Sequence, residues 1–147
     1  SSNSVDMRDC IFKGNKAHGF GAALRVQEST TLDMAECTFE GNQANGDGRG
    51  GGLALAESVD VRIQESIFSS NSADFGGAID SLIQVKLTVD GSKFSNNTAG
   101  NSGGAYNAAN ESTTDFNSCD FFENNAGIGG AIATYARCLR GSEKAGG

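Results

Sequence analysis

Apolar and polar residues alternate in short stretches that recur every 26 to 29 residues along the chain. Each stretch ends at a phenylalanine, and small or apolar residues occupy the seventh, fifth and second positions before it. The residue between the seventh and fifth positions is polar in all five repeats: Asp6, Asp33, Arg62, Thr88 and Asp115. A period of two predicts strands with one face inside and one face in water, because successive side chains of a strand point to opposite sides.

A phenylalanine–asparagine motif and a glycine segment define each repeat. The phenylalanines are Phe12, Phe39, Phe68, Phe94 and Phe121. An asparagine follows each of them three residues later, at Asn15, Asn42, Asn71, Asn97 and Asn124. After a gap of variable length come GAAL at 21–24, GGGL at 50–53, GGAI at 76–79, GGAY at 103–106 and GGAI at 129–132. Each glycine would cost a helix about 1 kcal/mol, which also favours strands and turns.

Repeats of this length predict a solenoid, since a single unit cannot bury its apolar face and needs a neighbour on each side. Stacked units would pair their strands in parallel about 4.8 Å apart, with like residues in ladders. We therefore predict an all-β fold, a right-handed parallel β-helix of about five coils over residues 1–132, with a C-terminal tail over 133–147.

The repeated side chains have separate roles in this prediction. The five phenylalanines form an interior column, and another inner wall contains Leu53, Ile79, Tyr106 and Ile132. The asparagines stand at a bend, where each amide can bond the same amide one coil away and satisfy backbone groups of the turn. The glycines allow the backbone to turn or to approach a neighbour closely.

Composition narrows the classes of partner. Eleven basic and eighteen acidic residues give a net charge of −7, which argues against nucleic acid or an anionic membrane as the main partner. No apolar run reaches the roughly 18 residues of a membrane-spanning helix. The chain begins without methionine, without a signal sequence and inside a repeat, so we expect it to be part of a longer chain.

Few residues are candidates for catalysis or for binding a metal or a cofactor. His18, the one histidine, has no serine, cysteine or aspartate at catalytic spacing and is expected on the surface in a turn. The outward row that contains Asp6 and Asp33 is interrupted by Arg62 and Thr88, so a carboxylate pair for polysaccharide cleavage is not favoured. We predict no catalytic residue, no cofactor and no metal site.

The second position before each phenylalanine is a slot for small residues, filled by Cys10, Cys37, Ser66, Ser92 and Cys119. Stacked side chains point the same way, so Cys10 and Cys37 are predicted to be free thiols. The alternation of cysteine with serine fits a structural slot better than a metal site. Cys138 lies outside the repeat and could reach Cys119 only if the tail folds back.

The longest gap, ANGDGRGGG at 44–52, is the candidate binding loop, since binding residues of solenoids tend to lie in insertions on one face. Asn45, Asp47 and Arg49 are its candidate contact residues, although a single aspartate is too little for a calcium loop. Asn96 and Asn110 begin Asn-x-Ser/Thr sequons, which are glycan acceptors if a eukaryotic cell exports the chain.

The repeats resemble a known family. Phe68-x-x-Asn71 with GGAI at 76–79, and the corresponding pairs that begin at Phe94 and Phe121, are similar to the FxxN and GGAI repeats of chlamydial polymorphic membrane proteins and related β-helical surface proteins. The resemblance covers nearly the whole chain, although GAAL and GGGL depart from GGAI. It implies a right-handed parallel β-helix and the exported passenger part of a surface protein involved in adhesion.

We therefore expect a non-catalytic structural or interaction module, a β-helical segment of a surface or extracellular protein that presents a stiff face for adhesion or assembly. Its expected partner is another protein or a second copy at the end coils, and carbohydrate is a further candidate. Two alternatives stay open. One is a carbohydrate-active enzyme, a polysaccharide lyase or hydrolase on a pectate-lyase-like β-helix, and the other is a scaffold subunit of a large assembly.

Overall fold

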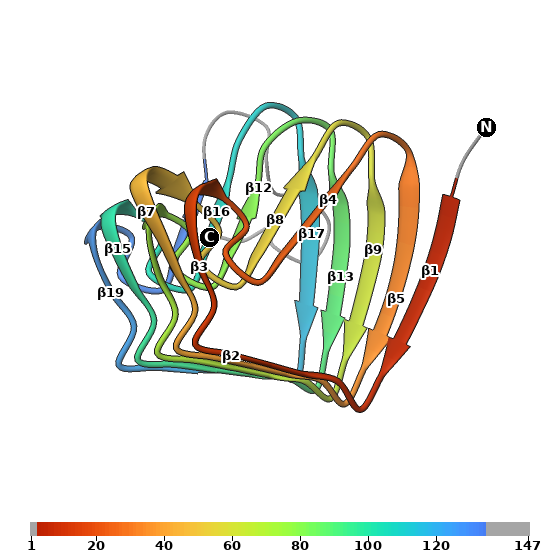
Figure 1. Cartoon of the computed structure of the whole chain (residues 1–147), viewed down its shortest axis with the longest axis horizontal. Coiled ribbons are helices and arrows are strands. Elements are labelled where there is room, and N and C mark those ends of the chain that lie inside the picture. Colours follow the sequence, from red (N-terminus) through yellow and green to blue (C-terminus); the bar gives the residue numbers. More distant parts are fainter. Residues whose placement is uncertain (1–2, 135–147) are drawn as a thin grey trace.

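The computed structural model describes residues 3–134, and these residues form a solenoid of five coils with four strands in each coil and no helix (Figure 1). The first coil contains β1 (Asn3–Arg8), β2 (Ile11–Lys13), β3 (Lys16–Phe20) and β4 (Leu24–Gln27). The second contains β5 (Thr30–Ala35), β6 (Thr38–Glu40), β7 (Gln43–Arg49) and β8 (Leu53–Ala56). The third contains β9 (Asp60–Gln64), β10 (Ile67–Ser69), β11 (Ser72–Phe75) and β12 (Ile79–Ser81).

The last two coils repeat this order. The fourth contains β13 (Lys86–Asp90), β14 (Lys93–Ser95), β15 (Thr98–Ser102) and β16 (Tyr106–Ala108). The fifth contains β17 (Thr113–Asn117), β18 (Asp120–Phe122), β19 (Asn125–Ile128) and β20 (Ile132–Thr134). The predicted tail therefore lies outside the described residues, except for its first two, which belong to β20.

Equivalent strands of successive coils pair in parallel and build four five-stranded sheets. The first sheet has the order β1-β5-β9-β13-β17, the second contains β2 and its copies, the third β3 and its copies, and the fourth β4 and its copies. The first, second and fourth sheets keep a continuous register, whereas the third has register shifts in each of its pairs. The prediction of an all-β parallel β-helix of about five coils is confirmed.

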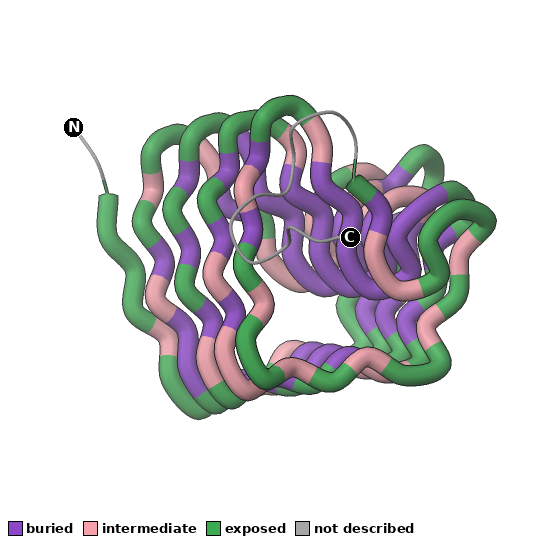
Figure 2. Tube along the Cα trace, turned by 180° about the vertical axis from the view of Figure 1, so that it is seen from behind, coloured by how far each residue is buried: buried purple, intermediate pink, exposed green. Residues whose placement is uncertain are grey.

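Inward and outward positions alternate along the strands, as Figure 2 shows for the walls of the coil. In β9, Val61 and Ile63 are fully buried, whereas Asp60 and Arg62 are exposed. The outward row expected from the sequence is also formed, since Asp6, Asp33 and Arg62 are register partners in β1, β5 and β9. The period of two in the sequence therefore sets which side of each strand faces the interior.

The second sheet carries a continuous column of phenylalanine rings. Phe12, Phe39, Phe68, Phe94 and Phe121 stack with centroid separations of 4.6, 4.7, 4.9 and 4.8 Å, and the middle three side chains are fully buried. A second inner wall on the fourth sheet is built from the register partners Leu24, Leu53, Ile79, Tyr106 and Ile132. These two walls form the core together with the inward side chains of the first sheet, such as Val61 and Ile63.

The asparagine of each repeat links its coil to both neighbours. The backbone N–H and the Nδ2 of Asn71 both donate to Oδ1 of Asn97 at 3.0 Å. Oδ1 of Asn71 accepts the same two bonds from Asn42, and its Nδ2 also donates to the carbonyl of Phe39 at 3.0 Å. Each inner asparagine therefore satisfies its own amide and the buried N–H of the preceding asparagine, and it adds a second bond to a carbonyl of the preceding coil.

The two glycines of each pair are needed for different reasons. Gly76 has a φ of 64°, and a Cβ at this position would collide with the carbonyl oxygen of Ile79 in the same turn. Gly77 has ordinary backbone angles, but a Cβ there would collide with the carbonyl oxygen of Gly104 in the next coil. The first glycine is required by the turn and the second by the close stacking of coils.

Replacing Phe68 by alanine should lower the free energy of unfolding by about 3–5 kcal/mol, because stacked strands cannot close the cavity that the missing ring leaves. Chemical denaturation of the variant measures this loss. Phe122→Ala is the matched control, since the Phe122 side chain is 51% exposed and should cost little. Equal stability of the two variants would contradict the importance of the column.

Asn71→Leu should destabilise the chain by about 3 kcal/mol or more, although leucine adds apolar bulk. The substitution leaves the N–H of Asn42 and one hydrogen on the Nδ2 of Asn42 buried without an acceptor, and each such group costs about 1–3 kcal/mol. Thermal and urea unfolding report the loss, and Asn101→Leu, at an exposed position of β15, is the control. An unchanged melting temperature for Asn71→Leu would contradict the ladder.

Candidate functional site

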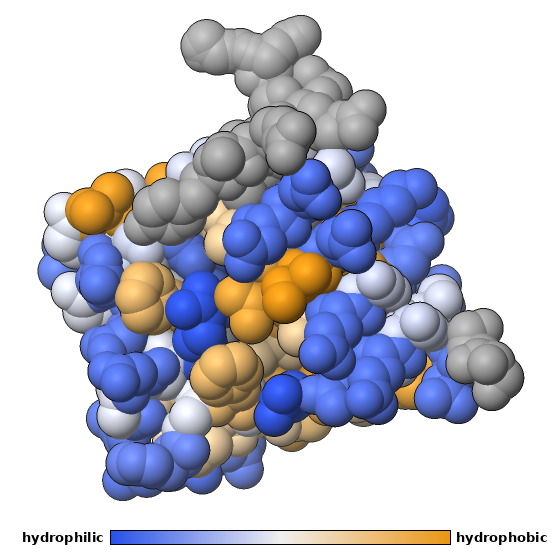
Figure 3. Space-filling view, turned by 90° about the horizontal axis from the view of Figure 1, so that it is seen from above, coloured by the Kyte–Doolittle hydropathy of each residue, from blue (hydrophilic) through white to orange (hydrophobic). Residues whose placement is uncertain are grey.

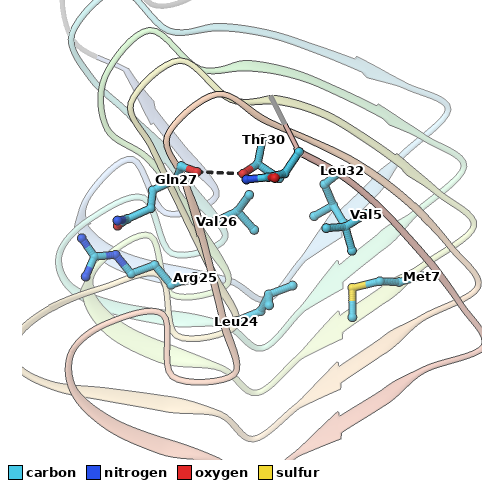
Figure 4. Close-up of a pocket in the computed structure, with 9 residues that line it drawn as sticks. Val5, Met7, Leu24, Arg25, Val26, Gln27, Thr30 and Leu32 are labelled. Carbon is cyan, nitrogen blue, oxygen red and sulfur yellow. Dashed lines mark hydrogen bonds between the residues drawn. The ribbon is translucent and has the colours of Figure 1, made fainter. Parts of the chain in front are cut away.

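The first coil leaves a hollow at the end of the solenoid. It has a volume of about 420 Å³ and is lined mainly by apolar side chains of β1, β4 and β5: Val5, Met7, Leu24, Val26 and Leu32. Figure 4 shows Leu24 and Val26 pointing across the hollow toward β1, whereas Arg25 and Gln27 of the same strand point away from it. Val5 is 42% exposed, while its register partner Leu32 is 2% exposed. The hollow is thus the open cross-section of the coil interior.

Asn15 carries an unused acceptor at the same end. Its backbone N–H and its Nδ2 donate to Oδ1 of Asn42, both at 2.9 Å. Its own Oδ1 has no hydrogen bond within residues 3–134, whereas Oδ1 of every later ladder asparagine accepts two bonds from the coil before it. We call this surface of β1–β4 the N-terminal edge.

The opposite surface, on β17–β20, is the C-terminal edge. Oδ1 of Asn124 accepts from the N–H and Nδ2 of Asn97 at 3.0 and 2.9 Å, and its Nδ2 donates to the carbonyl of Phe94. The N–H of Asn124 and the second hydrogen on its Nδ2 make no bond in the part of the chain from Asn3 to Thr134. This edge therefore offers donors where the N-terminal edge offers an acceptor.

The two edges also differ in charge. The first coil, β1–β4, carries four basic residues against two acidic ones: Arg8, Lys13, Lys16 and Arg25 against Asp6 and Asp9. The last coil, β17–β20, carries three acidic residues and no lysine or arginine: Asp115, Asp120 and Glu123. Opposite net charges at the two ends favour contact between unlike edges over contact between like edges.

The candidate loop at 44–52 is largely a strand. Residues Gln43–Arg49 form β7, which pairs with β3 and, through a shifted register, with β11. Asn45 and Asp47 are exposed, and Asn45 borders a shallow depression of about 280 Å³ together with Asp74 and Gly100. Arg49 lies at the other end of the strand, where it turns toward the fourth sheet. The structure therefore separates the three candidate contact residues.

Arg49 belongs to a buried polar network centred on Asp80. Its Nε donates to Oδ2 of Asp80 at 2.9 Å, and its guanidinium lies 4.4 Å from the centre of the Phe75 ring. Asn107 donates to Oδ1 of Asp80 at 2.7 Å and accepts from the hydroxyl of Ser102 at 2.9 Å. The network joins the second, third and fourth coils across the corner between the third and fourth sheets.

Asp80 is 1% exposed, so its charge depends on these partners. Burial raises the pKa of the Asp80 carboxyl above its ordinary value, and the Arg49 guanidinium and the Asn107 amide offset part of that rise. No repeat pattern predicts this network, because the residues at the position of Asp80 in the other coils are Arg25, Ala54, Asn107 and Ala133. In the sequence, Asp80 differs from the rest of the repeat only in that a charged residue stands where the preceding coil has Ala54.

The slot of cysteine and serine acts in the turn between the first and second sheets. The thiols of Cys10 and Cys37 lie 3.4 Å from the carbonyls of Arg8 and Ala35, two residues earlier in each case. Ser66 uses its hydroxyl in the same way and also accepts the N–H of Cys37. Burial raises the pKa of the Cys37 thiol, which disfavours a reactive thiolate. Cys138 lies outside the described residues.

The other candidate residues lie apart from one another. His18 is exposed as expected, although it is part of strand β3 and not of a turn. Asn96 and Asn110 of the two sequons are exposed, each with a φ of 54°. No group of three or more histidine, cysteine, aspartate or glutamate residues is placed to hold a metal ion within the described part of the chain. Between Asn3 and Thr134 no helix is long and apolar enough to cross a membrane.

The flank of the solenoid is mostly polar. Figure 3 shows the face above the fourth sheet, where hydrophilic side chains surround a small central group of apolar ones. Exposed large apolar side chains occur in the first coil at Val5 and Ile11, in the middle coil at Ile67 and in the last coil at Ile128.

No family model, curated protein or solved structure matches this chain. The similarity to polymorphic membrane protein repeats therefore rests on the FxxN and GGAI motifs themselves.

Arg49→Met should lower the free energy of unfolding at neutral pH by about 3 kcal/mol, because it leaves the buried Asp80 carboxylate without its cation. A carboxyl with a raised folded-state pKa contributes most stability when protonated, and that contribution is lost as the pH rises through that pKa. Removing Arg49 raises the pKa further, so the deficit should shrink as the pH falls.

Urea unfolding of Arg49→Met across pH 4–8 measures this effect. The double variant Arg49→Met with Asp80→Asn is the control, because it removes both charges and keeps an acceptor for Asn107. It should recover most of the loss at neutral pH. A deficit that is the same at every pH would show that Arg49 acts by packing on Phe75 instead.

Proposed function

We propose that this chain is a non-catalytic structural and interaction module, a stiff β-helical segment of a surface or extracellular protein that serves adhesion or assembly. One observation carries the proposal: the side chains that define the repeat are used in stacking. Phe68 packs between its copies, and Asn71 is hydrogen-bonded to its copies in both neighbouring coils. The repeated part of the sequence is thus accounted for by building a rod.

A carbohydrate-active enzyme on this fold would need charged groups from several coils in an open groove. Charged groups do converge at Arg49 and Asp80, but Asp80 is 1% exposed and its oxygens accept bonds from Arg49 and Asn107. A substrate would have to break that network to reach the carboxylate. This arrangement supports a structural role for the charged pair.

The coil ends favour protein over other classes of partner. Strand edges with unpaired N–H and C=O groups, next to an apolar hollow, bind another strand edge more readily than a soluble small molecule. A net charge of −7 argues against nucleic acid. Carbohydrate is retained as a candidate for the flank, where Asn45 and Asp74 border the shallow polar depression.

Two measurements test this function. Antibodies raised against the chain should label intact cells of the organism that encodes it as strongly as permeabilised cells, and labelling only after permeabilisation would contradict a surface location. The purified chain should release neither reducing ends nor unsaturated sugars from a panel of neutral and acidic polysaccharides. Catalytic release that disappears in an Asp80→Asn variant would support the enzyme instead.

A further inference from the structure

The four junctions between coils share one set of contacts. At each junction two phenylalanine rings stack 4.6–4.9 Å apart, and one asparagine donates its N–H and its Nδ2 to the next asparagine. All four sheets continue across each junction in parallel. These contacts therefore define what one coil needs from the next in order to stack on it.

The two edges hold the two halves of one further junction. At the N-terminal edge, Oδ1 of Asn15 has no hydrogen bond from residues 3–134 and lies in the same coil as the half-buried ring of Phe12. At the C-terminal edge, the N–H and Nδ2 of Asn124 are unused donors within the described residues, beside the half-buried ring of Phe121. An amide ladder has a direction, so these halves match only when unlike edges meet.

The apolar side chains of the two edges also match, since they occupy equivalent positions of the repeat. The inward rows place Phe116 at the position that Met7 occupies in the first coil, and Ile132 at the position of Leu24. Phe116 and Ile132 are only half-buried. A last coil set against the first would bring these side chains to the hollow that Met7 and Leu24 line.

From these matches we propose that two copies of the 147-residue chain dock head to tail, with the C-terminal edge of one copy on the N-terminal edge of the next. The asparagine ladder, the phenylalanine column and the four sheets then run on from one copy to the next. The basic first coil meets the acidic last coil, whereas contact between two N-terminal edges would oppose acceptor to acceptor and basic coil to basic coil. The contact is heterologous and generates chains of copies rather than closed dimers. The proposal rests on the proposed function and names its partner.

The half-buried side chain of Ile132 supplies a variant that blocks the C-terminal edge only. Ile132 lies in the inward row of Leu24 and Tyr106 and meets no later coil within residues 3–134. Ile132→Lys should therefore fold, yet place a charge against the apolar side chains of a docked first coil.

A lysine at Val5 blocks the other edge by placing a charge in the apolar hollow. Ile67→Lys is its matched control, because Ile67 is 44% exposed, as Val5 is 42% exposed, but lies on β10 in the middle coil. Circular dichroism and thermal melts establish that each variant is folded before association is measured.

Sedimentation velocity of the 147-residue chain over a wide range of concentration tests the proposal. The weight-average mass should rise with concentration beyond that of a dimer. Val5→Lys and Ile132→Lys should each raise the dissociation constant at least about tenfold, and Ile67→Lys should leave it unchanged. An equimolar mixture of Val5→Lys and Ile132→Lys should form dimers and nothing larger, because each variant keeps the edge that the other has lost.

Several results would overturn the proposal. A chain that stays monomeric at every concentration would mean that a coil of its own polypeptide, or another protein, covers the edge, and the module function would still stand. Dimers of Ile132→Lys alone would indicate contact between like edges. Association that Ile67→Lys abolishes would place the contact on the flank. Failure of the proposed function would be recorded separately, as polysaccharide cleavage or as intracellular labelling.

Discussion

The amide of the repeated asparagine is the interaction on which the rest of the structure depends. A coil that slipped by one residue would lose the bonds from Asn42 to Asn71 and turn the phenylalanine out of the interior, because side chains alternate along a strand. The amide is bidirectional: Oδ1 serves one neighbouring coil, and Nδ2 serves both. Each asparagine therefore fixes the register of three consecutive coils, and aromatic stacking follows from that register.

Repetition explains why so much of the fold could be predicted from the sequence. A ladder requires the same residue at the same place in each coil, so the phenylalanines, the asparagines and the inner wall through Ile79 are visible as a period. The turn glycines are visible for the same reason, since Gly76 occupies a conformation that few other residues tolerate. Physical demands that recur in every coil leave a signal in every repeat.

Features that occur once leave no such signal. The third sheet has shifts of register, and the extra residues of β7 belong to one of them, so the long segment at 44–52 predicts a loop where the structure has a strand. The pairing of Arg49 with Asp80 reaches diagonally from the second coil to the third and matches no row of the repeat. Ser81 lies in the fourth sheet with a buried hydroxyl that has no partner among the described residues, where Leu55 and Ala108 stand in the neighbouring coils. Such positions are set by packing in three dimensions.

A solenoid also couples association to stability. Each inner coil is held on two sides, whereas the first coil has one neighbour among the described residues, and its Phe12 and Met7 remain half-buried. In such a stack, stability is close to a sum of contacts between nearest neighbours, so the end coils are the least stable part of the rod. A partner that covers an edge binds only the folded coil and stabilises it by mass action. The contacts that build the interior of this rod are therefore the same contacts that its ends have available for a partner.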